Sequence, residues 1–254
     1  MGGAAADFVY GEEGEDVLFG DHGKVTTAQG GSEVESSHEA HGGADYLYGG
    51  ASHDVLIGGA DSDMLTDLEG NNVLIGDGGW AKLSAGSPLM AWDAKVYEAG
   101  AKSDGVGDDD TLTAGDLDDV LFGGAGDDLL VAGEGENYLA GDYGTWSLSN
   151  GVIDFSSPES SVEGTTGHDD LLVSGAGRDI HIGGIGSDEL QPGEGDDVLI
   201  GDRGYTHEDG LELVASGSAA LDGLEAGGND QLYAGLGEDI LIGGVGDDLL
   251  DDAF

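Results

Sequence analysis

A period of nine residues runs through most of this chain, and it restricts the possible folds more than any other feature. Aligned on the acidic residue before each apolar triplet, the sequence contains 17 units, starting at residues 2, 11, 40, 49, 58, 67, 105, 114, 123, 132, 165, 174, 183, 192, 225, 234 and 243. The sixth position is Asp in 15 of the 17 units, with Asn72 and Asn137 as the exceptions. The eighth is Leu in 15, with Val9 and His181 as the exceptions. Such constancy excludes a disordered Gly/Asp linker and predicts a repeat architecture.

The stretch GGAGDDLLV, residues 123–131, shows what one unit can form. Glycine allows positive φ and lets backbone carbonyls approach a common centre, and an Asp in such a turn adds an anionic oxygen. The apolar triplet that follows is too short to be a stable strand on its own. We therefore expect the central leucine of each triplet to point inward, against the leucine of an opposite strand, so that neighbouring coils bury a continuous leucine ladder.

The units GGADSDMLT, GGAGDDLLV, GGIGSDELQ and GGVGDDLLD resemble the GGxGxDxUx nonapeptide of the RTX (repeats-in-toxin) family, and the resemblance covers roughly 60% of the chain. It implies an all-β fold, a right-handed parallel β-roll (β-solenoid) in which six residues turn, three form a strand and two nonapeptides complete one coil. It also implies multiple calcium ions between turns stacked on the same side, held by position-six carboxylates and turn carbonyls.

A second, longer period lies above the first. Nonapeptides run together and then meet a GDxG step, at GDHGK from residue 20, GDGGW from 76, GDYGT from 141 and GDRGY from 201, so the steps are 56, 65 and 60 residues apart. We expect one elongated array over residues 1–254, with repeat blocks 2–23, 40–79, 105–144, 165–204 and 225–254. The inserts between the blocks are 24–39, 80–104, 145–164 and 205–224.

The inserts lack the nonapeptide and are predicted to be β-hairpins extruded from the roll. In WSLSNGVIDF a strand-like run from Trp146 meets Asn150-Gly151 and returns to Phe155, and Asp209-Gly210 stands in a similar place in the last insert. An Asn-Gly or Asp-Gly pair between two strand-like runs is the strongest short hairpin signal. Simple RTX rolls need no such insertions, so the pattern leaves open whether the roll continues past each insert.

The charge of the chain indicates what it needs in order to fold. With 54 acidic and 6 basic side chains the formal net charge is −48, and 52 residues are glycine. Self-repulsion and glycine entropy should keep such a chain unfolded unless divalent cations neutralise it. Nucleic acid and anionic membranes are excluded as partners because they require clustered Lys and Arg, and no apolar run has the length of a membrane span. The absence of cysteine excludes disulfides and zinc-thiolate sites.

The position-six aspartates are the predicted metal ligands, and carbonyl-rich glycine turns favour calcium over magnesium. The most regular turns contain Asp128, Asp188 and Asp248, preceded by Gly124, Gly126, Gly184, Gly186, Gly244 and Gly246. Less regular turns contain Asp45, Asp54, Asp63, Asp119, Asp170, Asp179, Asp197, Asp230 and Asp239. Asp16, like Asp7, lies near an end of the array, where a stacking partner is missing on one side. Asn72 and Asn137 are expected to bind weakly or not at all.

Two other sets of acids receive separate interpretations. The fifth-position acids, such as Asp127, Asp196 and Asp247, are expected to face solvent. The aspartates of the GDxG steps have two possible roles: closing a last calcium site, or forming a hydrogen bond into the hairpin turn. These aspartates are Asp21, Asp77, Asp142 and Asp202.

Positions seven and nine of the units are also mostly apolar, and if only position eight points inward they lie on the outside. We expect the inserts to fold back over that outer face through their aromatic residues, with an exposed strip for a partner or neighbouring domain as the alternative. The aromatic residues are Trp80, Trp92, Trp146, Phe155 and Tyr205.

No sequence motif indicates catalysis. GxSxG, HExxH, GxxxxGK[ST] and the GxGxxG fingerprint are absent, and carboxylate pairs are too abundant here to mark a glycosidase. His38 and His41 are interpreted as surface residues rather than a transition-metal site. His181 replaces an inward leucine and is expected to be a core position satisfied by a hydrogen bond, or a local break in the ladder.

These observations predict a calcium-binding structural repeat module of a secreted RTX-like bacterial protein, not an enzyme. Folding and calcium binding would be one event, because the unfolded chain has no preformed site. The resemblance implies export by type I secretion machinery and folding in extracellular calcium. We expect a spacer or adhesion segment of a large surface protein, whose partners are neighbouring domains or a cell-surface ligand. The alternatives are an export-and-folding domain of a secreted hydrolase or toxin, and an enzyme or sugar-binding module that uses the inserts.

The ends of the chain have two interpretations. The N-terminus MGGAAADFVY lacks a basic region followed by a long apolar core, so no signal peptide is expected. We interpret the chain as a window from a longer array. The alternative is a natural C-terminus at DDAF, similar to the acidic and then apolar export signals of some RTX proteins.

Overall fold

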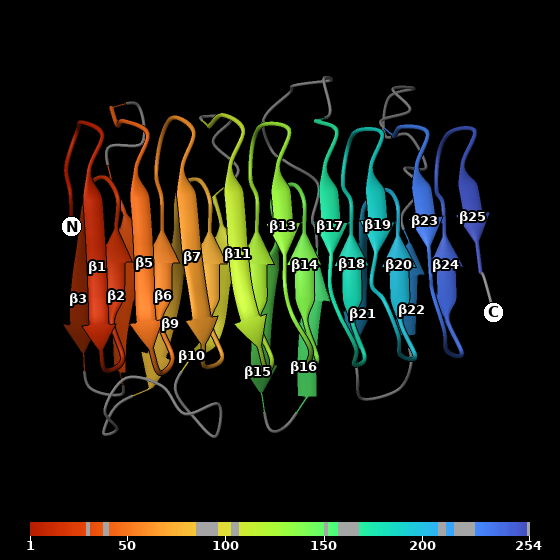
Figure 1. Ribbon diagram of the computed structural model, residues 1–254, viewed down its shortest axis with the longest axis horizontal. Helices are drawn as coiled ribbons and strands as arrows, with labels where there is room; N and C mark the ends of the chain where they lie inside the picture. Colours follow the sequence, from red (N-terminus) through yellow and green to blue (C-terminus); the bar gives the residue numbers. More distant parts are fainter. Residues whose placement is uncertain are drawn as a thin grey trace.

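The structure is a computed structural model that describes residues 1–28, 31–37, 41–84, 96–102, 107–149, 152–156, 168–207, 212–215 and 227–252. The described residues form three stacked β-sheets, two parallel and one antiparallel (Figure 1). Within these ranges there is no helix, and hence none long and apolar enough to cross a membrane.

The two parallel sheets together form the roll. The outer sheet contains β1 (Phe8–Glu13), β5 (Tyr46–Ala51), β7 (Met64–Glu69), β11 (Thr111–Asp116), β13 (Leu129–Val131), β17 (Leu171–Val173), β19 (Glu189–Gln191), β23 (Gln231–Tyr233) and β25 (Leu249–Asp251). The middle sheet contains β2 (Val17–Phe19), β6 (Val55–Ile57), β8 (Val73–Ile75), β12 (Val120–Phe122), β14 (Tyr138–Ala140), β18 (Ile180–Ile182), β20 (Val198–Ile200) and β24 (Ile240–Ile242). The chain alternates between them, so two nonapeptides make one coil. The predicted parallel β-roll is confirmed.

Register places the eighth position of each unit beside the eighth position of the next coil. Leu65 pairs with Leu112 and Leu112 with Leu130 in the outer sheet, and Leu74 pairs with Leu121 in the middle sheet. The leucines of the two sheets form one buried cluster between them. Burying each of these side chains stabilises the fold by about 1.5–3 kcal/mol, which compensates for the shortness of the strands.

The roll continues without a break past the inserts. β8 and β12 are adjacent parallel strands although residues 80–104 separate them in sequence, and β14 pairs with β18 across residues 145–164. His181 pairs with Leu139 and Leu199, and its side chain is fully buried with Nε2 2.8 Å from Ser174 Oγ. His181 is therefore a core position that makes one hydrogen bond, through Nε2, while its buried Nδ1 has no hydrogen-bond partner among the described residues. His41 is exposed as predicted, and His38 lies outside the described residues.

The inserts contribute the third sheet, named here the hairpin sheet. Its strands are β3 (Gly23–Ala28), β4 (Gly31–Ser36), β9 (Gly79–Ser84), β10 (Val96–Ala101), β15 (Thr145–Ser149), β16 (Val152–Ser156), β21 (Gly204–His207) and β22 (Glu212–Ala215). They pair in sequence order as one antiparallel meander. Trp146 lies opposite Phe155, as the Asn150-Gly151 signal predicts. Asn150-Gly151 itself and Asp209-Gly210 lie outside the described residues.

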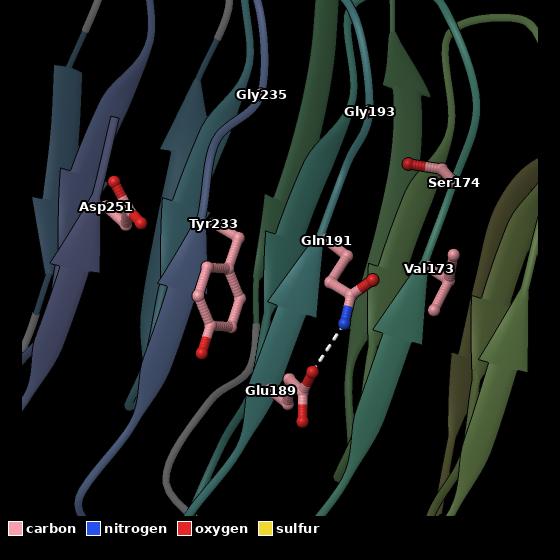
Figure 2. Close-up of a pocket in the computed structure, with 8 residues that line it drawn as sticks. All are labelled: Val173, Ser174, Glu189, Gln191, Gly193, Tyr233, Gly235 and Asp251. Carbon is pink, nitrogen blue, oxygen red and sulfur yellow. Dashed lines mark hydrogen bonds between the residues drawn. The ribbon is translucent and has the colours of Figure 1, made fainter. Parts of the chain in front are cut away.

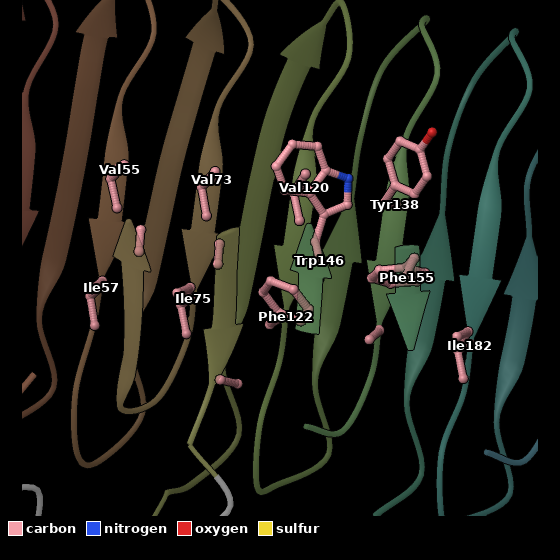
Figure 3. Packing of buried hydrophobic residues seen from close by; sticks show 14 of the residues in the cluster. Val55, Ile57, Val73, Ile75, Val120, Phe122, Tyr138, Trp146, Phe155 and Ile182 are labelled. Atoms are coloured by element: carbon pink, nitrogen blue, oxygen red, sulfur yellow. The ribbon is translucent and has the colours of Figure 1, made fainter. Parts of the chain in front are cut away.

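The hairpin sheet covers the outward face of the middle sheet. Phe155 packs on Phe122 and Tyr138, with ring centroids 6.1 and 5.6 Å apart, and Trp146 lies edge-on to Tyr138 at 6.4 Å (Figure 3). Trp146 is 2% exposed, whereas Trp80 is half-buried. The prediction that the inserts cover positions seven and nine is thus confirmed for the middle sheet. Trp92 and the side chain of Tyr205 lie outside the described part of the structure.

No described residue covers the outward face of the outer sheet. Its positions seven and nine include Phe8 at 65%, Met64 at 39% and Leu249 at 49% exposure. The insertion points explain this difference, because every hairpin returns over the same side of the roll. The inserts therefore cover the outward face of the middle sheet, as expected. The alternative, an exposed apolar strip, is present on the outward face of the outer sheet.

Candidate calcium-binding turns

The turns of the roll form two rows, one along each edge (Figure 1). Row one consists of the turns that lead into the outer sheet, and row two of those that lead into the middle sheet. The position-six residues of row one are Asp7, Asp45, Asp63, Asp110, Asp128, Asp170, Asp188, Asp230 and Asp248. Those of row two are Asp16, Asp54, Asn72, Asp119, Asn137, Asp179, Asp197 and Asp239.

Within each row the position-six side chains form a hydrogen-bonded ladder. The backbone N–H of Asp128 donates to Asp170 Oδ1 at 2.8 Å, and that of Asp170 donates to Asp188 Oδ1 at 2.9 Å. Row one is continuous in this way from Asp7 to Asp248, and row two from Asp16 to Asp239. One carboxylate oxygen of each aspartate is thereby fixed in space, and the other is left for a different partner.

That second oxygen, Oδ2, is buried and has no hydrogen-bond partner among the described residues in most of these aspartates. The set is Asp16, Asp45, Asp54, Asp63, Asp110, Asp119, Asp128, Asp170, Asp188, Asp197, Asp230 and Asp239. Buried carboxylates are rarely left unpaired, because the desolvated charge is costly unless a proton or a cation compensates it. So many orphaned oxygens, aligned in rows, are what hard-cation binding requires.

Glycine at the first position of the turn keeps a space open beside Oδ2. A Cβ at Gly123 would lie within 3.0 Å of both Asp128 Oδ2 and Gly141 O, and a Cβ at Gly183 would meet Asp188 Oδ2 and Gly201 O in the same way. A carboxylate and carbonyl oxygens of adjacent coils are ligands that calcium accepts. Among the described residues no three His, Asp or Glu side chains converge on one point, so a cation here needs such carbonyls. The residues present therefore fit calcium.

The six predicted turn glycines all adopt backbone conformations that other residues rarely reach. Their φ values are +126° and +124° at Gly124 and Gly126, and the other four lie between +116° and +154°. This conformation turns successive peptide units to different sides of the loop. Whether their carbonyls ligate calcium stays a prediction, as do the ligand roles of the aspartates.

Burial raises the pKa of the position-six carboxyls from Asp45 to Asp230 in row one and from Asp54 to Asp197 in row two. Desolvation is the largest cause throughout, and neighbouring aspartates add to it. It raises the pKa of Asp63 and Asp128 to about 8 and that of Asp188 to about 9, while Asp45 reaches about 6. In row two the pKa of Asp119 rises to about 9. Without a cation the folded turns therefore hold protons at a pH where free aspartate is ionised.

Two buried aspartates, Asp110 and Asp67, are not among the predicted ligands. Asp110 lies in the row-one ladder between Asp63 and Asp128 and is 2% exposed, and its place at position six of the unit starting at 105 was a sufficient signal. Asp67 stands at position one, where the repeat normally has a small residue. It is 1% exposed, and a Cβ at Gly49 would lie within 3.0 Å of both Asp67 Oδ2 and Asp54 Oδ2. No repeat-based signal marks Asp67.

The aspartates of the GDxG steps form hydrogen bonds to the following row-one turn. Asp21 Oδ2 accepts the N–H of Ala60 at 2.8 Å, and Asp142 Oδ2 accepts that of Ile185 at 2.5 Å. Asp77 and Asp202 do the same with Ala125 and Val245. Each therefore links a hairpin-bearing turn to the next plain one. A role in closing a calcium site stays untested.

The fifth-position acids face solvent, as predicted. Asp127, Asp196 and Asp247 are all exposed. They still contribute to stacking, because Asp127 Oδ1 accepts the N–H of Asp169 in the next coil at 3.0 Å.

The outer sheet also has a shallow depression of about 460 Å³ over β17, β19, β23 and β25 (Figure 2). Figure 2 shows Glu189 accepting a hydrogen bond from Gln191, with Tyr233 and Asp251 nearby. Its titratable lining residues are Glu189, Tyr233 and Asp251.

Comparison with known families supports the same reading as the turn geometry. The family model described as the RTX calcium-binding nonapeptide repeat (4 copies) matches residues 1–24, 39–65, 57–80, 104–139, 173–205 and 226–251, which is more than half of the chain. No curated protein and no solved structure matches the chain. The buried aspartates lie in the glycine turns of these repeats, and the strands between them form the roll. The chain therefore belongs to the RTX calcium-binding nonapeptide repeat family.

Proposed function

We propose that this chain is a calcium-dependent folding module of a secreted protein and that it carries no catalytic activity of its own. The observation that supports this most directly is the two rows of position-six carboxylates with buried, unpartnered Oδ2 atoms. The proposed ligands are the aspartates and turn glycines predicted above, with Asp110 added.

Calcium would supply the charge balance that the chain lacks. The formal net charge is −48, and the described ion pairs are few and half-buried, such as Lys82 with Glu98 and Lys102 with Glu35. Since the sites exist only when coils stack, the binding free energy of the ions is folding free energy. In low calcium the chain would stay unfolded and exportable, and outside the cell it would fold.

The elongated stack supports a role as a spacer or adhesion segment of a larger surface protein. Each coil contacts its neighbours through backbone ladders, so length grows with the number of coils. Type I secretion, an extracellular location and contacts with neighbouring domains or a cell-surface ligand are part of the proposal. The same fold would also suit an export-and-folding domain of a secreted hydrolase or toxin, and the presence of a catalytic domain in the same polypeptide would favour that function.

Circular dichroism during a calcium titration, with magnesium as the control cation, tests the folding function. We expect a disordered spectrum without metal and a cooperative rise of β signal with calcium, within the range of about 10⁻⁴–10⁻³ M typical of weak extracellular modules. Magnesium should have little effect, because it demands octahedral geometry and keeps its waters. A full β spectrum after exhaustive chelation at neutral pH would contradict the proposal.

A further inference from the structure

The two rows of turns differ in their first position. Every described turn of row one has glycine there, counting the GDxG steps, and at each of them a Cβ would lie within 3.0 Å of a position-six Oδ2. These residues are Gly2, Gly20, Gly58, Gly76, Gly123, Gly141, Gly183, Gly201 and Gly243. The space beside Oδ2 is therefore open along the whole of row one.

Row two has side chains in the same place from residue 114 onward. They are Ala114, Ala132, Ser174, Pro192 and Ala234, and all five are buried. A carbon atom thus occupies the position that row one leaves empty. Only Gly11 and Gly49, in the first two row-two turns, keep the space open.

The turn carbonyls of row two are already paired with turn amides of adjacent coils. Gly133 O accepts the N–H of Gly175 at 2.9 Å, and Glu194 O accepts that of Gly177 at 2.9 Å. Isolated parallel bridges connect Ala176, Glu194 and Leu236 through three successive turns. In row one the position-one carbonyls of Gly123 and Gly183 accept amides, but no described amide donates to the position-two carbonyls of Gly124 and Gly184, which correspond to Gly133 and Gly175 of row two.

Donors of the chain itself take the place of a cation in two row-two turns. Ser174 Oγ donates to Asp179 Oδ2 at 2.8 Å, so this carboxylate oxygen, unlike those of row one, has a partner. Asn137 Nδ2 donates to Gly133 O at 3.2 Å. An amide or hydroxyl donor neutralises these acceptors without metal.

We propose that from Ala114 onward calcium is bound along row one only, while row two is held together by hydrogen bonds of the chain itself. This inference rests on the proposed calcium function and narrows its set of ligands. It removes Asp119, Asp179, Asp197 and Asp239 from the ligands proposed above and assigns them a structural role instead. Because all the hairpins depart from row one, the calcium edge is also the edge that anchors the hairpin sheet. Asp119, Asp197 and Asp239 keep an unpartnered Oδ2, and the test therefore targets one of them.

The matched variants are Asp188→Asn in row one and Asp197→Asn in row two. Both aspartates are 1% exposed, lie in consecutive units, and accept one ladder amide through Oδ1, at 2.9 and 2.8 Å. Asparagine keeps that acceptor and removes the charge. Bound calcium per chain is measured by elemental analysis after equilibrium dialysis, and the calcium midpoint by circular dichroism.

Asp188→Asn should lose at least one ion and raise the calcium midpoint on the order of tenfold or more, because even the loss of an outer-shell partner of a ligand costs about 10–100-fold in metal affinity. Asp197→Asn should retain the wild-type number of ions. Equal loss in the two variants would overturn the one-row assignment while leaving the calcium function intact. Absence of binding by the wild-type chain would instead reject the proposed function.

A second pair keeps the test decisive if Asp188→Asn does not fold. Gly183→Ala places a methyl group between Asp188 Oδ2 and Gly201 O, whereas Ser174→Ala removes the hydroxyl that pairs with Asp179. Gly183→Ala should reduce the number of bound ions, measured on whatever fraction folds at saturating calcium. Ser174→Ala should lower the melting temperature without changing that number, and an ion lost from this variant would contradict the inference.

Discussion

At the scale of the residue, a buried aspartate in these turns has two ways to avoid an uncompensated charge: it holds a proton or it faces a cation. Burial favours the proton when no cation is present, which is why the pKa of Asp128 rises to about 8 and that of Asp188 to about 9. The proposed calcium ions would therefore compete with protons for the same oxygens, and their binding would release protons.

This competition predicts an inverted pH dependence for the metal-free chain. The folded-state pKa values of these aspartates lie above the value of 3.8 for free aspartate, so the folded state binds more protons than the unfolded chain between these limits. The resulting stability is present below about pH 4 and is lost as the pH rises through 6 to 9. Circular dichroism of the chelated chain from pH 3 to 9 should show β structure only in acid. A metal-free fold equally stable at pH 4 and pH 8 would refute this.

Asp67→Asn should affect the two states of the protein in opposite directions. Asp67 and Asp54 converge beside Gly49, and burial together with Asp54 raises the pKa of Asp67 to about 8. Above about pH 4 the wild-type carboxyl must take up a proton to stay neutral in the metal-free fold, whereas asparagine is already neutral. The variant should therefore stabilise the metal-free fold by about 1 kcal/mol near pH 5 and weaken the calcium-loaded form, measured by thermal unfolding with and without calcium. The control is Asp109→Asn, an exposed acid that keeps its amide acceptor. Similar shifts in both variants would show that Asp67 has no special role.

The position-six ladder was predictable because a nine-residue period places identical residues above one another once coils stack. Asp67 was not, because its importance comes from Asp54 on a neighbouring coil and no feature of its own unit reveals it. The hydrogen bond from Ala60 to Asp21 was missed for the same reason: the partners are 39 residues apart and belong to different turns.

At the scale of the element, each hairpin is specified locally but is placed by the roll. The Asn-Gly signal predicts that β15 pairs with β16, whereas the pairing of β10 with β15 depends on where two separate coils release their hairpins. For that reason the sequence predicted hairpins but neither their union into one sheet nor the choice of the middle sheet as the covered face.

Trp146→Ala tests how much the packing of the hairpin sheet on the middle sheet contributes to the free energy of unfolding. The indole is 2% exposed and packs against Tyr138, so its loss should cost about 3–5 kcal/mol, measured by denaturant unfolding in saturating calcium. Trp80→Ala is the control, because Trp80 is only half-buried and should cost clearly less. Equal costs for the two variants would mean that the buried interface with the middle sheet contributes little.

At the scale of the whole molecule, the middle sheet and the hairpin sheet have matching widths. Two coils contribute two strands to the middle sheet, and one hairpin contributes two strands to the hairpin sheet, so each of these two sheets has eight strands among the described residues. Strands are spaced about 4.7–4.9 Å apart in any sheet, so a hairpin covers the coils that carry it without overlap or gap. This equality gives a physical reason for the longer period seen in the sequence.

A protein built on such a match can change its length only in fixed increments. Each full period adds roughly 10 Å of length and leaves the cross-section unchanged. Loss of a whole period would shorten the rod and preserve its surface, whereas loss of a single coil would shift every later hairpin out of step with the strands beneath it. Evolutionary change in the length of the rod should therefore add or remove whole periods of two coils and one hairpin.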